Sequence, residues 1–469
     1  MTDNRYRHSN SNSYSYERKY YYRYKRSKLP ALFLTLMLAC SLFLTGCGSS
    51  GEIAGHKIPF VSELISTLAG DSLDDHEADR DAGSDHADKD GSEKGDDSGN
   101  KDGSKDKDKD QDKGKDKKKD TGRPDYGLAD PEGYLYLQLD KKERIIYDQI
   151  LEACFGFGKE IALDSRDEEQ IERIYYYVIA DHPDIFWTEG YKLSKMSLAG
   201  KVISISFTPK LSMSEEEAGD WKKTIDNKVK KFLKKAGTRT SDYGRIKYAF
   251  DYIVLHTDYE AGAEHNQNIC SVFGKGKSVC QGYSAALQYL LQRQGIQAVT
   301  VNGEIKENGS SHAWNYVQAD GKWYQIDVTW GDPAFSEGSS TAKIPKDLVV
   351  YTHFCVTDGQ ISKTHKLNSI FPMPACKASA DNYYVHEKQY FKEKNDTRLG
   401  NAIKKALKRN KNWVSLRYAD QKLYKSELKR LIDNHKIFDV MHKAGVGRNV
   451  NSISYIDSSS SLTLIVIWN

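Results

Sequence analysis

The sequence of 469 residues lacks an excess of charge of either sign, because 69 Lys and Arg residues nearly balance 66 Asp and Glu residues. Nucleic-acid-binding proteins usually carry a basic surplus, so this balance argues against a nucleic-acid partner. Long apolar runs are also scarce. The segment at residues 29–45 is apolar and free of charge, but it is short for a membrane-spanning helix, which needs about 20 residues. A membrane protein with several spans is therefore excluded.

Motifs that bind metal ions are missing as well. The chain has seven cysteines but no Cys-x-x-Cys pair and no His-Glu-x-x-His segment, so a zinc site has little support. No window fits a calcium loop, which needs Asp-x-Asp-x-Asp-Gly and a distal Glu. We therefore expect neither a metal ion nor a cofactor.

Composition divides the chain into three unlike parts. Residues 1–28 carry eight Lys and Arg residues, and residues after 123 have the apolar and aromatic content of a folded protein. Between them, residues 71–122 contain 19 acidic and 12 basic residues and almost no apolar ones. Such a segment cannot bury apolar surface, and its alternating charges keep it hydrated and extended. We expect residues 48–122 to form a disordered tether.

The apolar run at residues 29–45 has the length of a signal-peptide core and follows the basic segment directly. Leu44-Thr45-Gly46-Cys47 then resembles a bacterial lipobox, which implies cleavage before Cys47 and lipidation of its thiol. The alternative is an uncleaved anchor with an incidental cysteine. In both cases the basic end stays in the cytoplasm and residue 48 onward lies outside. Residues 1–47 are thus predicted to be a lipoprotein signal peptide, and the protein is expected to be lipid-anchored to a bacterial cell membrane, facing outward.

Hydrophobic periodicity predicts both helices and strands after residue 123. Two helical patterns and one strand pattern indicate an N-terminal α+β region at residues 123–235. A further helix is predicted from Ser241, within a central part at residues 236–380. Residues 381–469 show two helical and three strand patterns but no chemical motif. We interpret them as a C-terminal α+β module for packing or partner binding.

Cys280 is the cysteine whose surroundings indicate chemistry. Five cysteines follow Cys47, and an odd number outside the cytoplasm leaves at least one thiol unpaired. After Cys280, apolar residues recur at helical spacing until Gly295 ends the pattern. Cys280 is thus predicted at a helix N-terminus, where unpaired N–H groups and the helix dipole favour the thiolate. A lone cysteine is more often an inert buried residue, so its position alone does not establish catalysis.

A predicted hairpin brings a histidine close to an aspartate. Residues 312–319 alternate like a strand, Asp320-Gly321 is a two-residue turn, and residues 322–329 form the return strand. In this register His312 and Asp327 are diagonal neighbours on one face, with Cβ atoms about 7–8 Å apart. That separation permits an imidazole–carboxylate hydrogen bond, although an ordinary surface pair is the alternative. Four other histidines lack such a register and are expected to be structural or exposed: His256, His265, His353 and His365.

Three sequence blocks resemble the bacterial transglutaminase-like superfamily. The blocks are Val279-Cys280-Gln281-Gly282-Tyr283, Ser311-His312-Ala313-Trp314-Asn315 and Trp323-Tyr324-Gln325-Ile326-Asp327-Val328-Thr329-Trp330. They occur in this order, with 32 residues from Cys280 to His312 and 15 from His312 to Asp327. The combination is far more specific than any single block. It covers residues 241–335 well and leaves residues 125–235 and the tail uncovered.

The resemblance implies an α+β fold whose papain-like core packs a nucleophile helix on an antiparallel sheet. It implies a catalytic triad in which Cys280 attacks an amide carbonyl, His312 takes and returns the proton, and Asp327 fixes the imidazole tautomer. The backbone N–H of Cys280 is expected to be one oxyanion donor.

Other parts of the site are expected around this triad. A side-chain oxyanion donor is expected upstream of the nucleophile; Gln267 is our candidate, and Asn266 and Asn268 compete with it. Three aromatic residues near the motifs are expected to line the substrate groove, although aromatic residues more often belong to the core: Tyr283, Trp314 and Trp330.

An acyl-enzyme can pass to water or to an amine, so one triad serves peptidases, amidases and cross-linking transglutaminases. We expect a cell-surface cysteine enzyme that hydrolyses amide bonds of proteins or peptides. A protein cross-linking transamidase is the first alternative. The alternative of another class is a non-catalytic surface binding or scaffold module on the same fold, which would have no physical reason to keep three triad residues in register.

Overall fold

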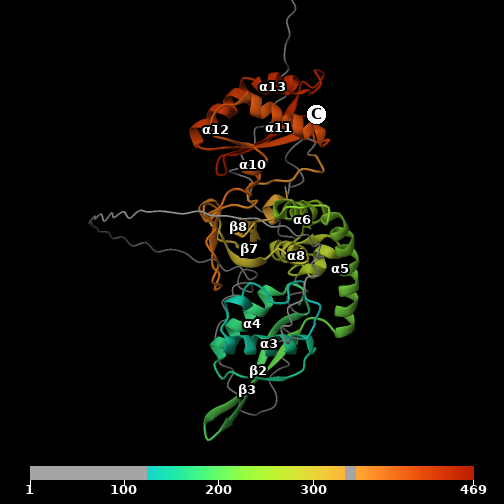
Figure 1. The fold of residues 1–469 in the computed structure, drawn as a ribbon, viewed down its shortest axis with the longest axis vertical. Coiled ribbons are helices and arrows are strands. Elements are labelled where there is room, and N and C mark those ends of the chain that lie inside the picture. The colour runs from blue at the N-terminus through green and yellow to red at the C-terminus, as the bar shows by residue number, and fades with distance from the viewer. Residues whose placement is uncertain (1–123, 333–344, 469) are drawn as a thin grey trace, which may run out of the picture. The chain divides into compact units, whose positions relative to one another are not determined.

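The structure is a computed structural model that describes residues 124–332 and 345–468 (Figure 1). The predicted signal peptide with Cys47 and the predicted tether lie outside the described residues. Within the described ranges, no helix combines the length and the apolar character that crossing a membrane requires.

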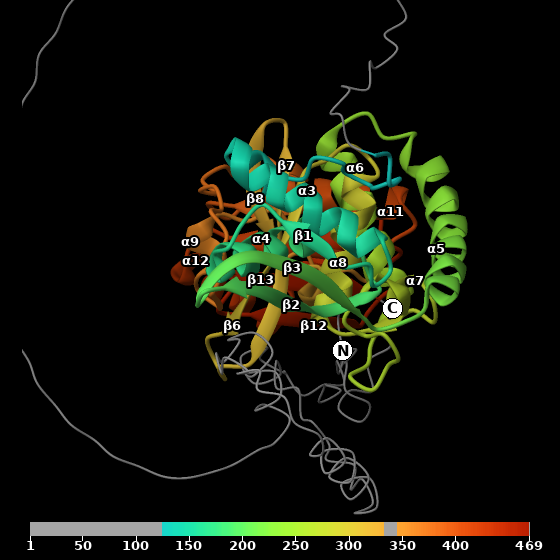
Figure 2. The same ribbon diagram turned by 90° about the horizontal axis from the view of Figure 1, so that it is seen from below.

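The first part of the described chain is a small antiparallel sheet with helices. Its elements are η2 (Tyr136–Gln138), α3 (Lys141–Phe155), β1 (Ile161–Leu163), α4 (Glu168–Asp181), β2 (Thr188–Leu198), β3 (Lys201–Leu211) and α5 (Glu215–Ala236). The strand order is β1-β3-β2, and Figure 2 shows β2 and β3 side by side at this end. Asp140 begins α3 by accepting hydrogen bonds from the backbone N–H groups of Lys142 and Glu143. The two predicted helices and the predicted strand are present, whereas β2 and the long α5 were not predicted.

The central part holds the helix that begins with Cys280. Its elements are α6 (Asp242–His256), β4 (Asp258–Tyr259), α7 (Ile269–Phe273), β5 (Lys277–Ser278), α8 (Cys280–Gln292), β6 (Ala298–Ile305), β7 (Ser311–Ala319), β8 (Lys322–Ile326), η3 (Thr329–Gly331), α9 (Asp358–Ile361) and β9 (His365–Leu367). Four of the strands form an antiparallel sheet in the order β8-β7-β6-β9. The short strands β4 and β5 form a separate parallel pair.

Helix α8 packs directly on this sheet, beside β7 (Figure 1). The Ser284 hydroxyl donates to the carbonyl of Ala313 at 3.0 Å, and the Asn315 amide donates to the carbonyl of Ser284 at 3.0 Å. These buried hydrogen bonds, together with apolar packing, fix the helix against the strand. The predicted fold class, a nucleophile helix on an antiparallel sheet within an α+β protein, is confirmed.

The hairpin follows the predicted register but ends earlier than predicted. Ala319 pairs with Lys322 and Asn315 with Ile326, and the Asp320-Gly321 turn has positive φ at both positions, as this turn type requires. The return strand was predicted to reach residue 329 and instead stops at Ile326. There the chain leaves β7, because the backbone N–H of Asp327 donates to the carbonyl of His353 at 3.0 Å.

The last part forms a second four-stranded sheet covered by helices. Its elements are α10 (Tyr383–His386), β10 (Tyr390–Phe391), α11 (Asp396–Lys408), β11 (Trp413–Tyr418), α12 (Gln421–Leu428), the π-helical turn η4 (Lys429–Asp433), α13 (Lys436–Ala444), β12 (Ile453–Ser458) and β13 (Thr463–Trp468). The strand order is β10-β11-β13-β12. The two predicted helices and three predicted strands of this tail are present, and α13 and β10 were not predicted.

Strand β13 is apolar on both of its faces, because each face packs in a different hydrophobic cluster. Ile465 and Ile467 belong to the large cluster that also contains the apolar residues of α8. The alternate residues Leu464 and Val466 pack in a second cluster, formed with α11 and α13. The period of two along a strand thus explains an apolar run without polar alternation.

Candidate active site

Cys280 is the first residue of α8, and the local sequence leaves this end of the helix without a side-chain cap. Val279 occupies the capping position and makes no side-chain hydrogen bond there. Gly282 lies in the first turn, where a Cβ atom would clash with the Ser278 hydroxyl and the Asn266 carbonyl. The uncapped N–H groups and the helix dipole both favour a negative charge on the Cys280 sulfur.

Cys280 is also the accessible cysteine of the described chain. Its side chain is partly exposed, whereas the other four described cysteines are buried, and none of the five is in a disulfide: Cys154, Cys270, Cys355 and Cys376 are the buried ones. Burial raises the pKa of Cys154 to about 12 and that of Cys355 well above the ordinary thiol range. Those four thiols are therefore poor nucleophiles.

Cys280 and His312 stabilise each other as an ion pair. Burial alone would raise the pKa of Cys280, but a hydrogen bond with His312, the charge of that imidazole and the N–H of Ala313 together lower it. Burial likewise disfavours a charged His312, yet Asp327 and Cys280 raise the pKa of His312 to about 10. The geometry thus favours a thiolate beside an imidazolium.

Asp327 is fully buried and holds His312 in place. Its Oδ2 atom lies 2.8 Å from Nε2 of His312, which leaves Nδ1 of that ring for Cys280. Its Oδ1 atom accepts a hydrogen bond from the backbone N–H of Trp330 at 3.1 Å. Burial would raise the pKa of Asp327, but the two imidazoles that it contacts hold it far below the usual range. The hydrogen bond predicted between His312 and Asp327 is present.

A second imidazole, that of His365, contacts the same carboxylate oxygen. Nε2 of His365 lies 3.1 Å from Oδ2 of Asp327, and its Nδ1 lies 2.8 Å from the Thr364 hydroxyl. Burial lowers the pKa of His365, so this ring is the neutral donor of the pair. His365 was expected to be structural or exposed; it is buried, and it contacts the carboxylate that orients His312. It arrives on the edge strand β9, where it pairs with Ile305 of β6.

Tyr259, on the short strand β4, also lies beside the nucleophile. Strand β4 pairs with β5 so that Tyr259 is opposite Ser278, two residues before Cys280. Burial raises the pKa of the Tyr259 phenol, as does the negative charge of Cys280, whereas a hydrogen bond from the backbone N–H of Cys280 lowers it. The phenol is therefore adjacent to the N–H group that was predicted to be an oxyanion donor.

Comparison with known proteins identifies the family of one domain of the chain. Residues 230–328 match the family model of the Transglutaminase-like superfamily. The chain contains a transglutaminase-like domain. The family predicted from the three sequence blocks is thereby confirmed, and this superfamily includes both cysteine peptidases and transglutaminases.

Individual relatives cover only parts of the chain. The Kyphoscoliosis peptidase of Mus musculus is 28% identical over 157 residues, which is 30% of this chain and 23% of the relative. The Kyphoscoliosis peptidase of Homo sapiens is 28% identical over 125 residues, 24% of this chain and 18% of the relative. The chain thus spans less than a quarter of the length of these relatives. A solved structure of a TGase is similar with 17% identity and a TM-score of 0.23, covering 40% of this chain and 55% of that one.

Two of the aromatic residues predicted to line a groove in the transglutaminase-like domain are core residues instead. Tyr283 is 0% exposed and donates to the carbonyl of Thr257 at 2.7 Å. Trp314 is 1% exposed, and its indole N–H donates to Oε1 of Gln325 at 2.8 Å. Both predictions were wrong. For Trp314 the reason is that Cys376, with neighbouring apolar side chains, packs over its face of the sheet.

Trp330 is also buried, and it lies beside His312. It is 7% exposed, and its ring centroid is 6.2 Å from that of His312. It also lines a pocket of about 310 Å³, together with residues that include Lys306, His353 and Arg417. Its predicted contact with substrate stays a prediction. His353 was expected to be structural or exposed; it is buried, and burial lowers its pKa to about 3, so it remains neutral.

The amides proposed as oxyanion donors make other contacts. Gln267 is exposed and donates to Oδ1 of Asn266 at 3.1 Å, and among the described residues no hydrogen bond joins it to Cys280. Asn266 donates to the carbonyl of Ala261, and Asn268 caps α7 through the N–H of Cys270. The structure therefore brings the loop of Gln267 near the helix start without giving its side chain the predicted role.

His312 and Asp327, together with His365, could also hold a metal ion. Ligand atoms of His312, Asp327 and His365 lie within 4.8 Å of one another, and two imidazoles with a carboxylate are a suitable donor set for zinc. An ion bound there would replace the hydrogen bond between His312 and Asp327. It would also need both imidazoles neutral, against the raised pKa of His312. The set fits a hydrogen-bonded triad better than a resident metal.

The ion pair predicts an unusual pH dependence for alkylation of Cys280. Because His312 lowers the pKa of Cys280, we expect the pH midpoint of its reaction with iodoacetamide to lie below the ordinary thiol value of about 8.5. In His312→Ala the midpoint should move upward. The rate is measured on the full chain by peptide mass spectrometry, with the exposed His256→Ala as matched control. An ordinary midpoint that His312→Ala leaves unchanged would contradict the ion pair.

Proposed function

We propose that the chain is a cysteine enzyme that hydrolyses amide bonds of proteins or peptides through an acyl-enzyme on Cys280. The observation that carries this proposal is the partly exposed Cys280 at the start of α8, joined to His312, which Asp327 holds from behind. A nucleophile, a base and an orienting carboxylate in this order form a recurring arrangement for acyl transfer.

The proposed reaction uses only groups of this site. The Cys280 thiolate attacks the carbonyl carbon, the C–N bond breaks, and the imidazolium of His312 gives its proton to the leaving amine. A thioester on Cys280 remains. Neutral His312 then takes a proton from water, whose oxygen attacks the thioester and releases the carboxylic acid together with the thiolate. Asp327 stays ionised throughout, because both imidazoles that contact it favour its charge.

The developing oxyanion needs donors close to the Cys280 sulfur. We assign this role to the hydroxyl of Tyr259 and to the backbone N–H of Cys280, which would give up its hydrogen bond to the Tyr259 oxygen when substrate enters. A phenol hydroxyl both accepts and donates hydrogen bonds. The Tyr259 hydroxyl can therefore turn its proton toward a substrate oxygen that enters beside it.

Water is the acceptor that we favour for the acyl group. Water is abundant, whereas an amine acceptor competes with it only if the site binds the amine. Transamidation remains the first alternative and a non-catalytic surface module the second. We further propose that the enzyme acts outside the cytoplasm, on a lipid anchor at Cys47, as the signal-like segment and the charged tether suggest.

The test follows the fate of acyl groups in glutamine-containing peptides incubated with the full chain. We expect cleavage or deamidation that proceeds without an added amine and is absent in Cys280→Ala. A fluorescent primary amine should enter the peptides only in a minor fraction of turnovers. Addition of EDTA should leave the rate unchanged, since the triad needs no metal.

Each other outcome has a defined meaning. If most products carried the amine, the activity would be assigned as transamidation and not as hydrolysis. A rate that EDTA abolishes and zinc restores would assign the His312, Asp327 and His365 set to a metal. Absence of any thioester at Cys280 across a broad peptide panel, with ordinary alkylation of Cys280, would favour the binding module.

A further inference from the structure

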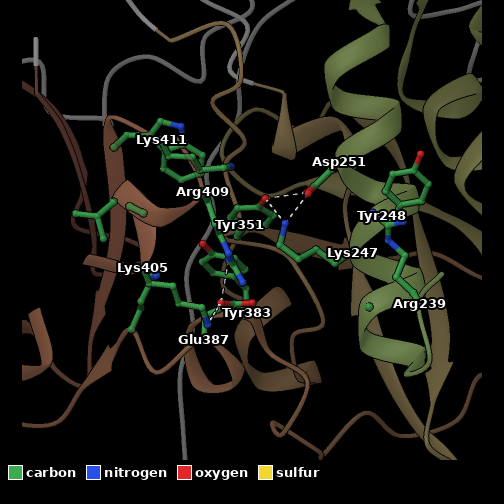
Figure 3. Close-up of a pocket in the computed structure, with 15 residues that line it drawn as sticks. Arg239, Lys247, Tyr248, Asp251, Tyr351, Tyr383, Glu387, Lys405, Arg409 and Lys411 are labelled. Carbon is green, nitrogen blue, oxygen red and sulfur yellow. Dashed lines mark hydrogen bonds and ion pairs between the residues drawn. The ribbon is translucent and has the colours of Figure 1, made fainter. Parts of the chain in front are cut away.

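A separate pocket of about 270 Å³ lies away from the triad residues, which are not part of its lining (Figure 3). One wall comes from α6 and the residues just before it, and the other comes from α10 and from the end of α11 through the start of β11. The stacked rings of Tyr351 and Tyr383, with centroids 3.8 Å apart, close the pocket between these walls. Tyr243 joins them by donating a hydrogen bond to Oε1 of Glu387 at 3.1 Å.

Positive charge predominates in this lining. Five cationic side chains face two carboxylates, those of Asp251 and Glu387; the cations are Arg239, Lys247, Lys405, Arg409 and Lys411. No proposed step of the amide chemistry uses any of them. The formal charge of the lining is therefore +3 at neutral pH.

The two carboxylates are already engaged. Asp251 pairs with Lys247 at 2.5 Å. Glu387 is shared by Lys405 at 2.6 Å and Arg409 at 3.3 Å, so one negative charge serves two cations. Figure 3 shows both groups of contacts as dashed lines, on different sides of the pocket.

Lys411 and Arg239 are without a carboxylate partner in the described parts of the chain. The Lys411 ammonium lies 4.0 Å from the centre of the Trp413 ring, and the Arg239 guanidinium lies 3.8 Å from that of Tyr248. In such a contact the aromatic ring covers one side of the cation, and N–H donors of the cation remain for another ligand. Burial, together with the positive charges of Lys247 and Arg409, lowers the pKa of Lys411 to about 8. An anion beside Lys411 would relieve this repulsion.

We propose that this pocket binds a dianionic phosphate group, free or as the monoester of a small molecule, with Lys247, Arg409 and Lys411 around the phosphate. At neutral pH a phosphate monoester carries about 1.5 to 2 negative charges and free phosphate carries between one and two. Both have several acceptor oxygens, which suits an excess of three cations. The arginine supplies a planar pair of donors and the lysines supply point charges. The adjoining aromatic rings give the organic part of a monoester an apolar wall to pack on.

Binding is tested by calorimetry on the full chain at constant ionic strength, with inorganic phosphate and glycerol 3-phosphate as the two probes. Both dianions should bind, and the monoanionic diester dimethyl phosphate should bind more weakly. Lys411→Met should weaken phosphate binding by about tenfold or more, the loss expected for one contact between charged groups. Arg409→Gln should weaken it as well. The matched control is Lys408→Gln, which removes the exposed lysine at the end of α11, next to Arg409 but outside the pocket lining, and should change nothing.

The outcomes distinguish a specific phosphate site from non-specific attraction of anions to a basic surface. Tighter binding of glycerol 3-phosphate than of phosphate would identify a monoester as the natural ligand, and equal binding would identify the free ion. Both support the site. Equal binding of the diester, equal loss in Lys408→Gln or no saturable binding of either dianion would overturn the proposal. If Lys411→Met unfolds at a lower temperature without ligand, Arg409→Gln decides the result, because the Arg409 side chain is about half exposed.

Discussion

Cys280→Ala is expected to lower turnover by a factor on the order of 10⁴ or more while leaving the fold intact. The replacement removes the nucleophile, and what remains is the slight rate that binding and oxyanion donors provide. The side chain is partly exposed at a helix start, so its loss opens no cavity in the core. The measurement is the rate of amide hydrolysis, with the thermal unfolding midpoint recorded beside it.

Cys270→Ala provides the matched control for this variant. Cys270 is fully buried in α7, ten residues before the nucleophile. Its replacement should therefore cost about 1 kcal/mol of stability and leave the rate per folded molecule unchanged. If Cys280→Ala kept more than a small fraction of the native rate, Cys280 would not be the nucleophile.

Asp327→Asn is expected to reduce turnover by about 10³ to 10⁴. Both imidazoles approach the same carboxylate oxygen, at 2.8 and 3.1 Å, and the other oxygen accepts the N–H of Trp330. An asparagine has one acceptor oxygen for these three donors, and its NH₂ group meets another donor. The pKa of His312, now about 10, should fall, because its main charged partner is gone. The midpoint for alkylation of Cys280 should then rise.

The pH dependence separates this role from a structural one. In the native protein, turnover should decline as the pH rises through about 10, since His312 then loses the proton that the leaving amine needs. In Asp327→Asn this decline should begin at lower pH. The control is Asp358→Asn, whose carboxylate accepts from Gln325 and from the N–H of Cys376 but not from His312. An equal loss of activity in both variants, without a shifted pH profile, would make Asp327 a structural residue.

The predicted parts of the site depend on interactions that are local in sequence. The apolar spacing after Cys280 is a property of one helix, and the register of His312 with Asp327 follows from one two-residue turn. Both features can be predicted from the spacing of residues along the chain. The early end of the return strand cannot be predicted in this way, because it depends on a backbone hydrogen bond from Asp327 to the distant His353.

The residues of the site that the sequence did not predict are positioned by pairing between short strands. His365 reaches Asp327 because β9 adds to the edge of the sheet at β6, and Tyr259 reaches Cys280 because β4, a strand of two residues, pairs with β5. Strands of two or three residues have too little pattern to be recognised in a sequence. The prediction that Trp314 lines the groove failed for a related reason. Alternation shows that Trp314 shares a face with His312, but not that the segment with Cys376 covers that face.

The two faces of β13 have a consequence for how the described part of the chain unfolds. Ile465 and Ile467 pack in the cluster that holds α8, while Leu464 and Val466 pack with the helices of the last sheet. Neither cluster can open without removing half of the support from this strand. Residues 124–332 and 345–468 should therefore melt cooperatively, and we expect the two sheets on either side of the predicted boundary at residue 381 to unfold together.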